Sequence, residues 1–337
     1  MSVRIVHTAD LHLGSRMSSM GDCADDFREA LVHSFDTLLE KTAASEAAIL
    51  LIAGDFLEMN EIREREVTRI ASLLRRERPF YILLAAGNHD PYTAASAYAE
   101  ELADIPGFHI FAAGDIERID FPEHDVSVYG ASFSSLYQTS TILPVPGQET
   151  RVWVGKNGLI SVSEVQNPSP CNNALGLIHG TLLGGSGTQS RHESTQLYNP
   201  IYEAEIASLP LAYLALGHIH KPSPIPRQSL YSSDLLALYP GSPQGISFNE
   251  RNERHALVID VADNQLVNIA AIETSDRLFI DLDVEIETKD TDMAIQQKIM
   301  TAIKERTGDH FGRHAYRITL RGECPEGFSV DALETTL

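Results

Sequence analysis

The sequence predicts an α/β fold in which helices cover a largely buried sheet. Its first half alternates short apolar runs rich in β-branched residues with longer stretches of helical periodicity. Such alternation is typical of strand–helix–strand units, in which the helices pack on the faces of the sheet. The apolar runs lack a regular polar alternation, as expected of strands that are buried on both faces.

The expected elements of the first half follow one another closely. The first strand is predicted in "VRIVH", the first helix over residues 24–44, the second strand in "AAILLIAG", the second helix over residues 61–78 and the third strand in "FYILLAAG". Shorter strands are expected in "FHIFAA", "ERIDF" and "VSVYGASF". Residues 138–173 are rich in Pro, Ser, Asn and Gly, which favours an elaborated loop or small hairpins.

The second half predicts a further set of strands and then a separate appendage. Strands are expected in "ALGLIHG", "LAYLALGHIH", "HALVIDV" and "LVNIAAIET". Beyond residue 275 a strand in "LFIDLDVEIET", an amphipathic helix in "TDMAIQQKIMTAIKER" and a strand in "AYRITLRG" predict a compact α/β unit. We therefore expect one domain over 1–275 and a second over 276–337. The final "VDALETTL" resembles the start of a helix, as in a second domain that is incomplete.

Composition predicts an ordinary globular protein of the cytoplasm. Hydrophobic residues make up 43% and charged residues 22% of the chain. No apolar run reaches the roughly 18 residues that span a bilayer, and the N-terminus lacks the layout of a signal peptide, so no membrane association is expected. Cys23, Cys171 and Cys324 are far apart and form no C-x-x-C pair, which argues against a zinc knuckle or disulfide framework and predicts free thiols.

The net charge limits what the surface can bind. A formal charge of -21 predicts an acidic surface, which repels a phosphate backbone unless cations or a partner protein intervene. The arginine-rich helix over residues 61–78 also contains glutamates, which favours a solvated, ion-paired face over a DNA contact.

Polar residues gather where the predicted strands end. They lie in "HTADLHLG", "LIAGDF", "LLAAGNHDPY", "GLIHG" and "LALGHIH", and they are Asp10, His12, Asp55, Asn88, His89, Asp90, His179, His218 and His220. The carboxyl ends of the strands of an open α/β sheet form one edge, where ligands bind. We therefore expect these side chains to lie close together.

The chemistry of these side chains favours transition metals. Carboxylate oxygens, imidazole nitrogens and an amide oxygen suit manganese, iron or zinc better than calcium or magnesium. The pairs Asp10/His12 and His218/His220 have i, i+2 spacing, which puts both members on one side of an extended segment. The ligands are too many for one tetrahedral ion and suffice for two ions that share a carboxylate. Each motif alone has a plain reading as a turn, but their joint order favours the metal site.

This series of motifs resembles the calcineurin-like metallophosphoesterase superfamily. Within it, "HTADLHLG", "GNHDP", "ALGHIH" and "YPGSPQGISFNE" are most similar to the SbcD/YhaO-like DNA repair exonuclease family. The resemblance covers residues 3–260. It implies a four-layer αββα sandwich and places the C-terminal α/β unit where that family carries a capping domain.

The resemblance also implies residue roles. One metal would be held by Asp10, His12, Asp55 and His220, and the other by Asp55, Asn88, His179 and His218. Asp55 would be the bridging carboxylate, and manganese would be the usual ion. His89 lies beside a ligand but outside both sets, so we expect it to protonate the leaving group, with Asp90 orienting it or keeping it protonated. The family position of Arg191 and His192 makes them expected substrate contacts, the alternative being a plain surface loop.

Three functions remain open at this point. The first is a manganese-dependent DNA exonuclease or endonuclease of repair or defence, which works with an SbcC/Rad50-like SMC ATPase and forms a homodimer, as the resemblance implies. The second is a metallophosphoesterase acting on a small phosphodiester or nucleotide, which an acidic surface tolerates better. The third is a scaffold with a vestigial site, although no expected ligand is missing from the sequence.

Overall fold

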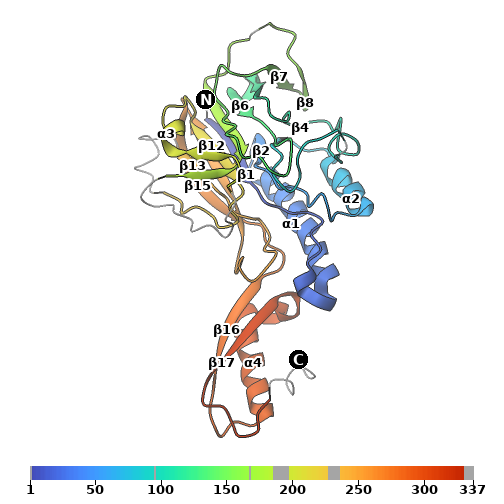
Figure 1. Cartoon of the computed structure of the whole chain (residues 1–337), viewed down its shortest axis with the longest axis vertical. Coiled ribbons are helices and arrows are strands. Elements are labelled where there is room, and N and C mark those ends of the chain that lie inside the picture. The colour runs from blue at the N-terminus through green and yellow to red at the C-terminus, as the bar shows by residue number, and fades with distance from the viewer. Residues whose placement is uncertain (1, 95, 167, 185–196, 227–235, 330–337) are drawn as a thin grey trace. The chain divides into compact units, whose positions relative to one another are not determined.

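The computed structural model describes residues 2–94, 96–166, 168–184, 197–226 and 236–329. Its contacts divide the chain into two compact units (Figure 1). The first comprises Met1–Gln244 and Arg254–Asp276, and the second comprises Gly245–Glu253 and Arg277–Leu337. The second unit therefore takes in residues 245–253, which the sequence had placed inside the first domain.

The first unit contains a mixed sheet that includes the three strands predicted near the N-terminus. Among the described residues this sheet is six-stranded, in the order β15-β14-β1-β2-β3-β4. The strands in chain order are β1 (Ser2–Thr8), β2 (Ile49–Ile52), β3 (Tyr81–Leu84), β4 (Phe108–Ile110), β14 (His255–Ala262) and β15 (Gln265–Glu273). Strands β1 to β4 are parallel, whereas β14 and β15 add antiparallel at one edge.

A second sheet is formed by the middle of the chain. In the part of the chain that the structure describes it is seven-stranded, in the order β13-β12-β9-β6-β5-β7-β8. Its strands are β5 (Glu117–Phe121), β6 (Val126–Gly130), β7 (Arg151–Lys156), β8 (Leu159–Val162), β9 (Asn173–His179), β12 (Tyr213–Gly217) and β13 (Leu236–Leu238). The hairpin β7–β8 lies in the segment for which a loop or small hairpins were predicted.

The two sheets pack face to face around one apolar core. Ile5 and Leu83 from the first sheet and Val128 and Leu177 from the second are fully buried in this core. Aligned sheets packed in this way bury alternate residues of every strand between them. The core therefore fixes where each strand ends, and with it the edge that carries the polar residues.

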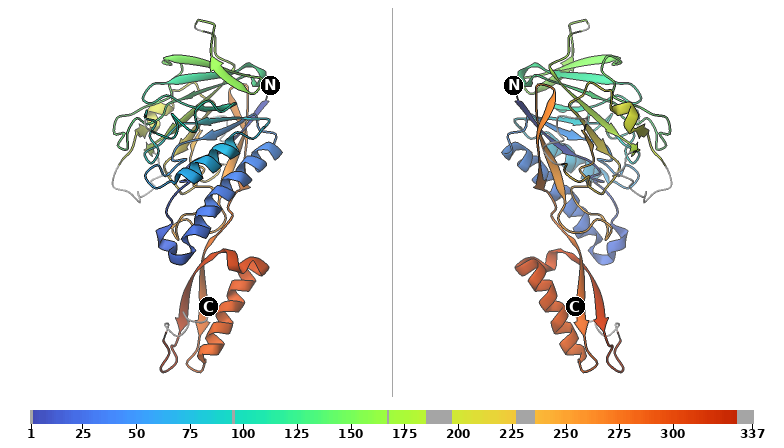
Figure 2. Two further views of the ribbon diagram at one scale, coloured as in Figure 1. Left: turned by 90° about the vertical axis from the view of Figure 1, so that its right-hand side faces the viewer. Right: turned by 90° about the vertical axis from the view of Figure 1, so that its left-hand side faces the viewer.

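Helices cover the outer faces of the sheets unequally. Figure 2 shows α1 (Ala24–Ala44) and α2 (Glu64–Leu74) on the outer side of the first sheet. The outer face of the second sheet packs against the short α3 (Glu203–Ile206) and neighbouring loops, with Ile206 buried among β9 and β12 residues. The predicted α/β fold is confirmed, with a thin fourth layer. A pair of short strands, β10 (Thr181–Leu183) and β11 (Pro200–Tyr202), and the 3₁₀ helices Ser18–Cys23 and Pro122–His124 complete this unit.

Three arginines of the predicted second helix form ion pairs with α1. Arg63 pairs with Asp25 at 3.5 Å, and Arg76 pairs with Asp36 at 2.6 Å. Arg69 also pairs with Glu29. These arginines therefore neutralise acidic residues of their own chain, in keeping with the ion-paired face that the sequence predicted.

The second unit is a strand–helix–strand arrangement, as the sequence predicted. Strands β16 (Phe279–Ile286) and β17 (Ala315–Gly322) pair in parallel, and α4 (Asp292–Thr307) connects them with the 3₁₀ helix Gly308–Arg313. Ile295, Ile299 and Ile303 recur every fourth residue along α4 and form its buried stripe. Among the described helices of the chain, none is both long and apolar enough to cross a membrane. Cys23, Cys171 and Cys324 are free thiols.

The packing between the two sheets predicts that truncating a core residue lowers the free energy of unfolding much more than truncating an exposed residue. Leu177→Ala removes a fully buried side chain from both sheets' shared core and should lower the free energy of unfolding by about 2–5 kcal/mol, because it leaves a cavity. Leu136→Ala, at a side chain 41% exposed, is the matched control and should change it by less than about 0.5 kcal/mol. Urea unfolding followed by circular dichroism measures both. Equal losses would contradict the packing of the sheets.

Candidate metal centre

The loops that follow β1 and β2 are tied together at the edge of the first sheet. The backbone N–H of Asp10 donates to the carbonyl of Gly54 at 3.0 Å, and the N–H of His12 donates to the carbonyl of Asp55 at 2.9 Å. The loop after β12 joins them, because the N–H of His218 donates to the Asp10 carboxylate at 3.0 Å. The polar ends of strands from both sheets therefore meet at one place.

Ligand-type atoms converge there in three overlapping groups. Within each group these atoms lie within 4.8 Å of one another, and the groups are Asp10, His12 and His220; Asp10, Asp55 and His179; and His12, Asp55 and His89. The Nε2 atoms of His12 and His220 are 3.1 Å apart. Two ligands bound about 2.1 Å from one ion lie about 3 Å apart, so this spacing fits a shared metal ion.

A second set of ligand-type atoms surrounds His179. Its Nε2 lies 3.1 Å from the Asn88 side-chain oxygen and 3.4 Å from Asp55 Oδ2. The ring of His218 lies beside it, with 5.3 Å between the ring centroids. Asp55 therefore stands between the group around His12 and the group around His179, which is the position that a bridging carboxylate requires.

Hydrogen bonds fix the tautomers of two of these histidines. His179 Nδ1 lies 2.8 Å from the carbonyl oxygen of Ala53. His12 Nδ1 lies 3.1 Å from the carboxylate of Glu58. Because a carbonyl or carboxylate oxygen only accepts, each Nδ1 donates to it. In the neutral ring Nε2, which faces the cluster, then has the lone pair that a metal ion would bind. Neutral imidazoles held in this way are the form that binds metal ions.

The charges of the cluster also fit divalent cations. Asp10 and Asp55 are both buried. Burial raises the pKa of Asp10, because its charge loses contact with water, and the neighbouring charge of Asp55 adds to this effect. Burial also lowers the pKa of His218 to about 3, which keeps its imidazole neutral. Carboxylates placed together in this way are stabilised when a positive ion lies between them.

The ligand-bearing loops adopt a backbone that ordinary residues avoid. Asp10, His12, Asp55 and His218 have φ angles of 54°, 45°, 49° and 107°. The sequence had predicted that the pairs Asp10/His12 and His218/His220 converge because each lies on an extended segment. The structure shows instead that their backbone turns through left-handed conformations. Residues in such conformations cost about 1–3 kcal/mol each and persist at functional sites, where the surrounding structure holds them.

A close approach requires glycine beside the ligands. At Gly87 a Cβ atom would lie 2.4 Å from Asp55 Oδ1, and at Gly217 it would lie 1.7 Å from the carbonyl oxygen of Ala53. Any side chain at either position would displace the loop after β2. The glycines that precede Asn88 and His218 are therefore part of what positions the cluster.

Glu58 is a member of the site that the sequence analysis missed. Its two carboxylate oxygens accept from His12 Nδ1 at 3.1 Å and from His89 Nδ1 at 3.0 Å. Although burial opposes its charge, these hydrogen bonds lower the pKa of Glu58 to about 2. The same contact, with Asp55 nearby, raises the pKa of His89 to about 9 against the effect of burial. In the sequence, the one feature that could have indicated this role is that Glu58 closely follows Asp55 in "GDFLE".

Asp90 has a structural role beyond the one expected. We predicted that it orients His89 or keeps it protonated. Glu58 makes the orienting contact, and the charge of Asp90 is among the causes that raise the pKa of His89. The Asp90 carboxylate is fully buried and accepts from the N–H groups of Phe56 at 2.7 Å and Gly87 at 2.6 Å. It also accepts from the hydroxyl of Tyr98 and, at 3.2 Å, from the N–H groups of Asp55 and Leu57. Asp90 therefore joins the loops after β2 and β3, and its oxygens are directed to their amides.

The remaining predicted residues fall into two classes. Arg191 and His192 lie outside the described residues. The "YPGSPQG" segment contacts residues next to the ligands. The hydroxyl of Tyr239 donates to the carbonyl of Gly180 at 2.9 Å. Because Gly241 has no side chain, its backbone can lie close to the carbonyl oxygen of His220. Beside the cluster the ring of Tyr198 lies 5.3 Å from that of His218 and stacks on Tyr137 at 6.4 Å, an arrangement that the sequence did not reveal.

The contacts of Glu58 predict a role in metal affinity. Glu58→Ala releases His12 and His89 from their shared acceptor and should weaken Mn²⁺ binding by about 10–100-fold, the usual effect of removing the partner of a ligating histidine. Glu64→Ala removes an exposed charge at the start of α2 and is the control. Isothermal titration calorimetry with Mn²⁺ measures both. An unchanged affinity in Glu58→Ala would show that His12 needs no support from this carboxylate.

Comparisons with known proteins agree with this geometry. The SbcD component of the SbcCD nuclease of Staphylococcus epidermidis is 24% identical over 272 residues, covering 79% of this chain and 68% of that protein. A Bacillus subtilis protein named uncharacterized metallophosphoesterase YhaO is 23% identical over 337 residues, covering 95% of this chain and 72% of that one. The DNA double-strand break repair protein Mre11 of Methanopyrus kandleri is 25% identical over 266 residues, covering 75% of this chain and 52% of the relative.

A family model gives the classification. The model for calcineurin-like phosphoesterases matches residues 3–222, a span that includes every residue of the three ligand groups. With the α/β sandwich and the buried Asp and His cluster, this match identifies the chain as a member of the calcineurin-like phosphoesterase family.

Proposed function

We propose that this protein is a two-metal phosphodiesterase that cleaves DNA, acting as an exonuclease or endonuclease in repair or defence. The observation that carries the proposal is the position of Asp55 between two groups of ligand atoms, with the Nε2 lone pairs of His12 and His179 directed inward. The names of the SbcD and Mre11 relatives support DNA as the substrate.

The residues divide into two ligand sets in this proposal. Asp10, His12, Asp55 and His220 hold one ion, and Asp55, Asn88, His179 and His218 hold the other. Paired divalent ions supply Lewis acidity to a phosphodiester and lower the pKa of a bound water. The mixture of carboxylate oxygen and imidazole nitrogen suits Mn²⁺, Fe²⁺ or Zn²⁺, and from the resemblance we propose Mn²⁺.

His89 is placed to act on the leaving group. Its side chain is 43% exposed, so a bound substrate can reach it, whereas the ring of His12 beside it is 3% exposed. Glu58 holds Nδ1, and the backbone N–H of His89 donates to Asp55 Oδ1 at 2.9 Å. The ring is therefore fixed beside the cluster, with Nε2 available to donate a proton to the departing oxygen. Asp90 contributes by holding the loop that carries it.

DNA capture by a partner resolves the problem of charge. The chain carries a formal charge of -21, and two divalent ions would offset four of these charges. We propose that an SMC-like ATPase of the SbcC/Rad50 kind brings the DNA, and that the nuclease works as a dimer. The rings of Tyr137 and Tyr198 offer a stacking surface for a base beside His218, since Tyr137 is 62% exposed.

A small phosphodiester or nucleotide is the second candidate substrate. The acidic surface favours it, because a small substrate needs no extended contact with the protein. Such an enzyme would use the same ligands and the same proton donor. The two candidates differ in whether a polymer can reach the cluster.

A substrate panel separates these functions. With Mn²⁺, we expect the protein to cleave linear duplex DNA or single strands as well as bis-p-nitrophenyl phosphate, because the ligand atoms converge as two-metal catalysis requires. Release of nucleotides and of nitrophenol provides the measurement, and chelation of the metal is the control. Hydrolysis of the small diester alone, also when an SMC-like ATPase partner is added, would exclude the nuclease. Failure on every substrate, with metal bound, would favour a scaffold or the absence of a required partner.

His89 provides a test of the proton donor. His89→Ala should reduce turnover by about 10²–10⁴-fold, since it removes a general acid, while Mn²⁺ affinity stays close to that of the unmodified protein. The control is His310→Ala, an exposed histidine of the second unit, which should be fully active. Steady-state kinetics and calorimetry give the two readouts. Full turnover in His89→Ala would remove this residue from the mechanism.

A further inference from the structure

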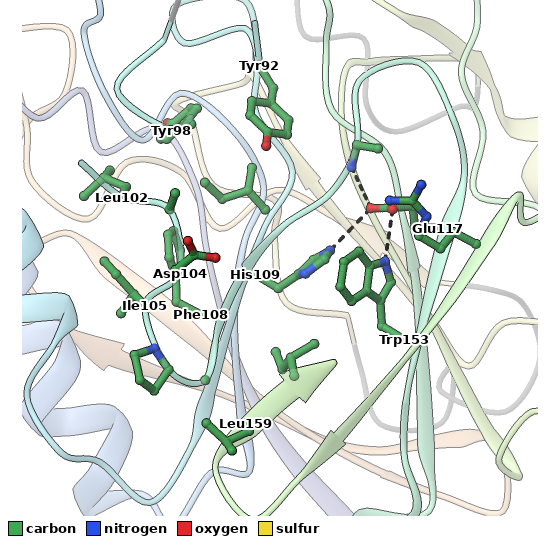
Figure 3. Close-up of a pocket in the computed structure, with 17 residues that line it drawn as sticks. Tyr92, Tyr98, Leu102, Asp104, Ile105, Phe108, His109, Glu117, Trp153 and Leu159 are labelled. Atoms are coloured by element: carbon green, nitrogen blue, oxygen red, sulfur yellow. Dashed lines mark hydrogen bonds and ion pairs between the residues drawn. The ribbon is translucent and has the colours of Figure 1, made fainter. Parts of the chain in front are cut away.

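A cavity of about 460 Å³ opens at the side of the sandwich where β4 and β8, the edge strands of the two sheets, lie near each other (Figure 3). Its volume is in the range of pockets that hold small organic ligands. The structure describes every residue that lines it, and none of them belongs to the ligand sets named above. Nothing in the proposed hydrolysis uses this cavity.

Aromatic and aliphatic side chains form the apolar part of its wall, beside a comparable polar part. Trp153, the single tryptophan of the chain, stands on one side, and Phe108, Leu102 and Ile105 stand on the other. Leu159 closes the lower end in Figure 3 and is 58% exposed. A flat ligand can stack on the indole between these walls, where it would bury apolar surface.

The polar groups of the cavity are few and held in place. Buried Glu117 accepts from Trp153 Nε1 at 3.0 Å, from the backbone N–H of Ala112 at 2.7 Å and from His109 Nε2 at 3.3 Å. Although burial opposes its charge, the hydrogen bonds from His109, Trp153 and Ala112 lower the pKa of Glu117, so the carboxylate is ionised. These contacts fix the indole and the imidazole in one arrangement before any ligand arrives.

Charges of opposite sign lie at two different places in the cavity. Figure 3 shows the carboxylate of Asp104 projecting into the cavity between Phe108 and His109. The guanidinium of Arg151 lies over the Trp153 ring, 5.7 Å from its centroid. The cavity therefore offers an acceptor for hydrogen-bond donors at Asp104 and a cation over the Trp153 ring.

The wall is also rigid on the side of the metal loops. Tyr98 lines the cavity, and its hydroxyl donates to the buried carboxylate of Asp90. Its ring packs edge-on against that of Tyr92, with 6.3 Å between the centroids. A preformed wall of this kind reduces the entropy that a ligand must lose on binding.

We propose that this cavity binds a nucleotide whose base carries an exocyclic amino group. The base stacks on Trp153, its amino group donates to Asp104, and its phosphate pairs with Arg151. An entirely apolar ligand would leave Asp104 without its water, which is unfavourable. A purely cationic ligand would meet the charge of Arg151 at the indole face. A base with an amino group and an attached phosphate satisfies all three groups at once.

The single tryptophan allows a direct test with AMP as the probe. The full chain, loaded with Mn²⁺, is titrated with AMP while Trp153 emission is followed at an excitation wavelength that adenine does not absorb. Chromatography checks that AMP stays intact. We expect saturable quenching by AMP, and weaker quenching by inosine monophosphate, which replaces the amino group by a carbonyl.

Two variants separate the contacts. Asp104→Asn keeps the shape of the residue, and asparagine tolerates its φ of 54°, but the side chain loses its charge. It should weaken AMP binding by about tenfold but should not weaken inosine monophosphate, whose carbonyl oxygen accepts no bond from the carboxylate. Arg151→Ala should weaken AMP by a similar factor and leave adenosine unchanged, because adenosine lacks the phosphate. Both residues are exposed, and circular dichroism confirms that the variants fold.

The outcomes decide the proposal. Saturable quenching that Asp104→Asn and Arg151→Ala weaken in this pattern supports it. Calorimetric heat from AMP without any change in Trp153 emission would place the nucleotide elsewhere, such as at the metal cluster, and would overturn it. Quenching that neither variant changes, or equal affinity for AMP and inosine monophosphate, would also overturn it. Each result is independent of whether the protein cleaves DNA.

Discussion

One buried carboxylate, that of Asp90, ties the functional loops into a single frame. It accepts from the amides of Phe56 and Gly87 and from the hydroxyl of Tyr98, and so bridges the loops after β2 and β3. A buried charge of this kind is tolerated only where donors surround it, and removing donors leaves a large desolvation cost. Since Asp55 and Asn88 belong to those two loops, their relative position follows from this bridge.

Acceptors behind the histidines decide which nitrogen faces the cluster. The carbonyl of Ala53 and the carboxylate of Glu58 take the Nδ1 protons of His179 and His12, so both rings present Nε2 inward. Ala53 directly follows β2. Gly217, the last residue of β12, can lie close to the carbonyl of Ala53 because it has no side chain. The sandwich core therefore controls the chemistry of the ligands through backbone positions and not only through packing.

The metal cluster and the cavity beside Trp153 share one segment of the chain. This segment runs from Asn88, His89 and Asp90 to Tyr92 and Tyr98 in the wall of the cavity. The cluster gathers buried carboxylates that favour cations, whereas the cavity combines a carboxylate and a guanidinium around an indole. The connection between β3 and β4 thus contributes residues to two environments of different chemistry, with Tyr98 and Asp90 in contact between them.

The sequence by itself determined the α/β class, the succession of the main strands along the chain and the residue types at their ends, because apolar runs and the polar residues after them are local features. It did not reveal the role of Glu58, the amides around Asp90, or the inclusion of residues 245–253 in the second unit. It also suggested an extended backbone where Asp10 and His12 have positive φ. Only the tertiary structure decided these points, since a hydrogen-bond partner, a strained turn and a cavity between edge strands depend on which distant segments the packed core brings into contact.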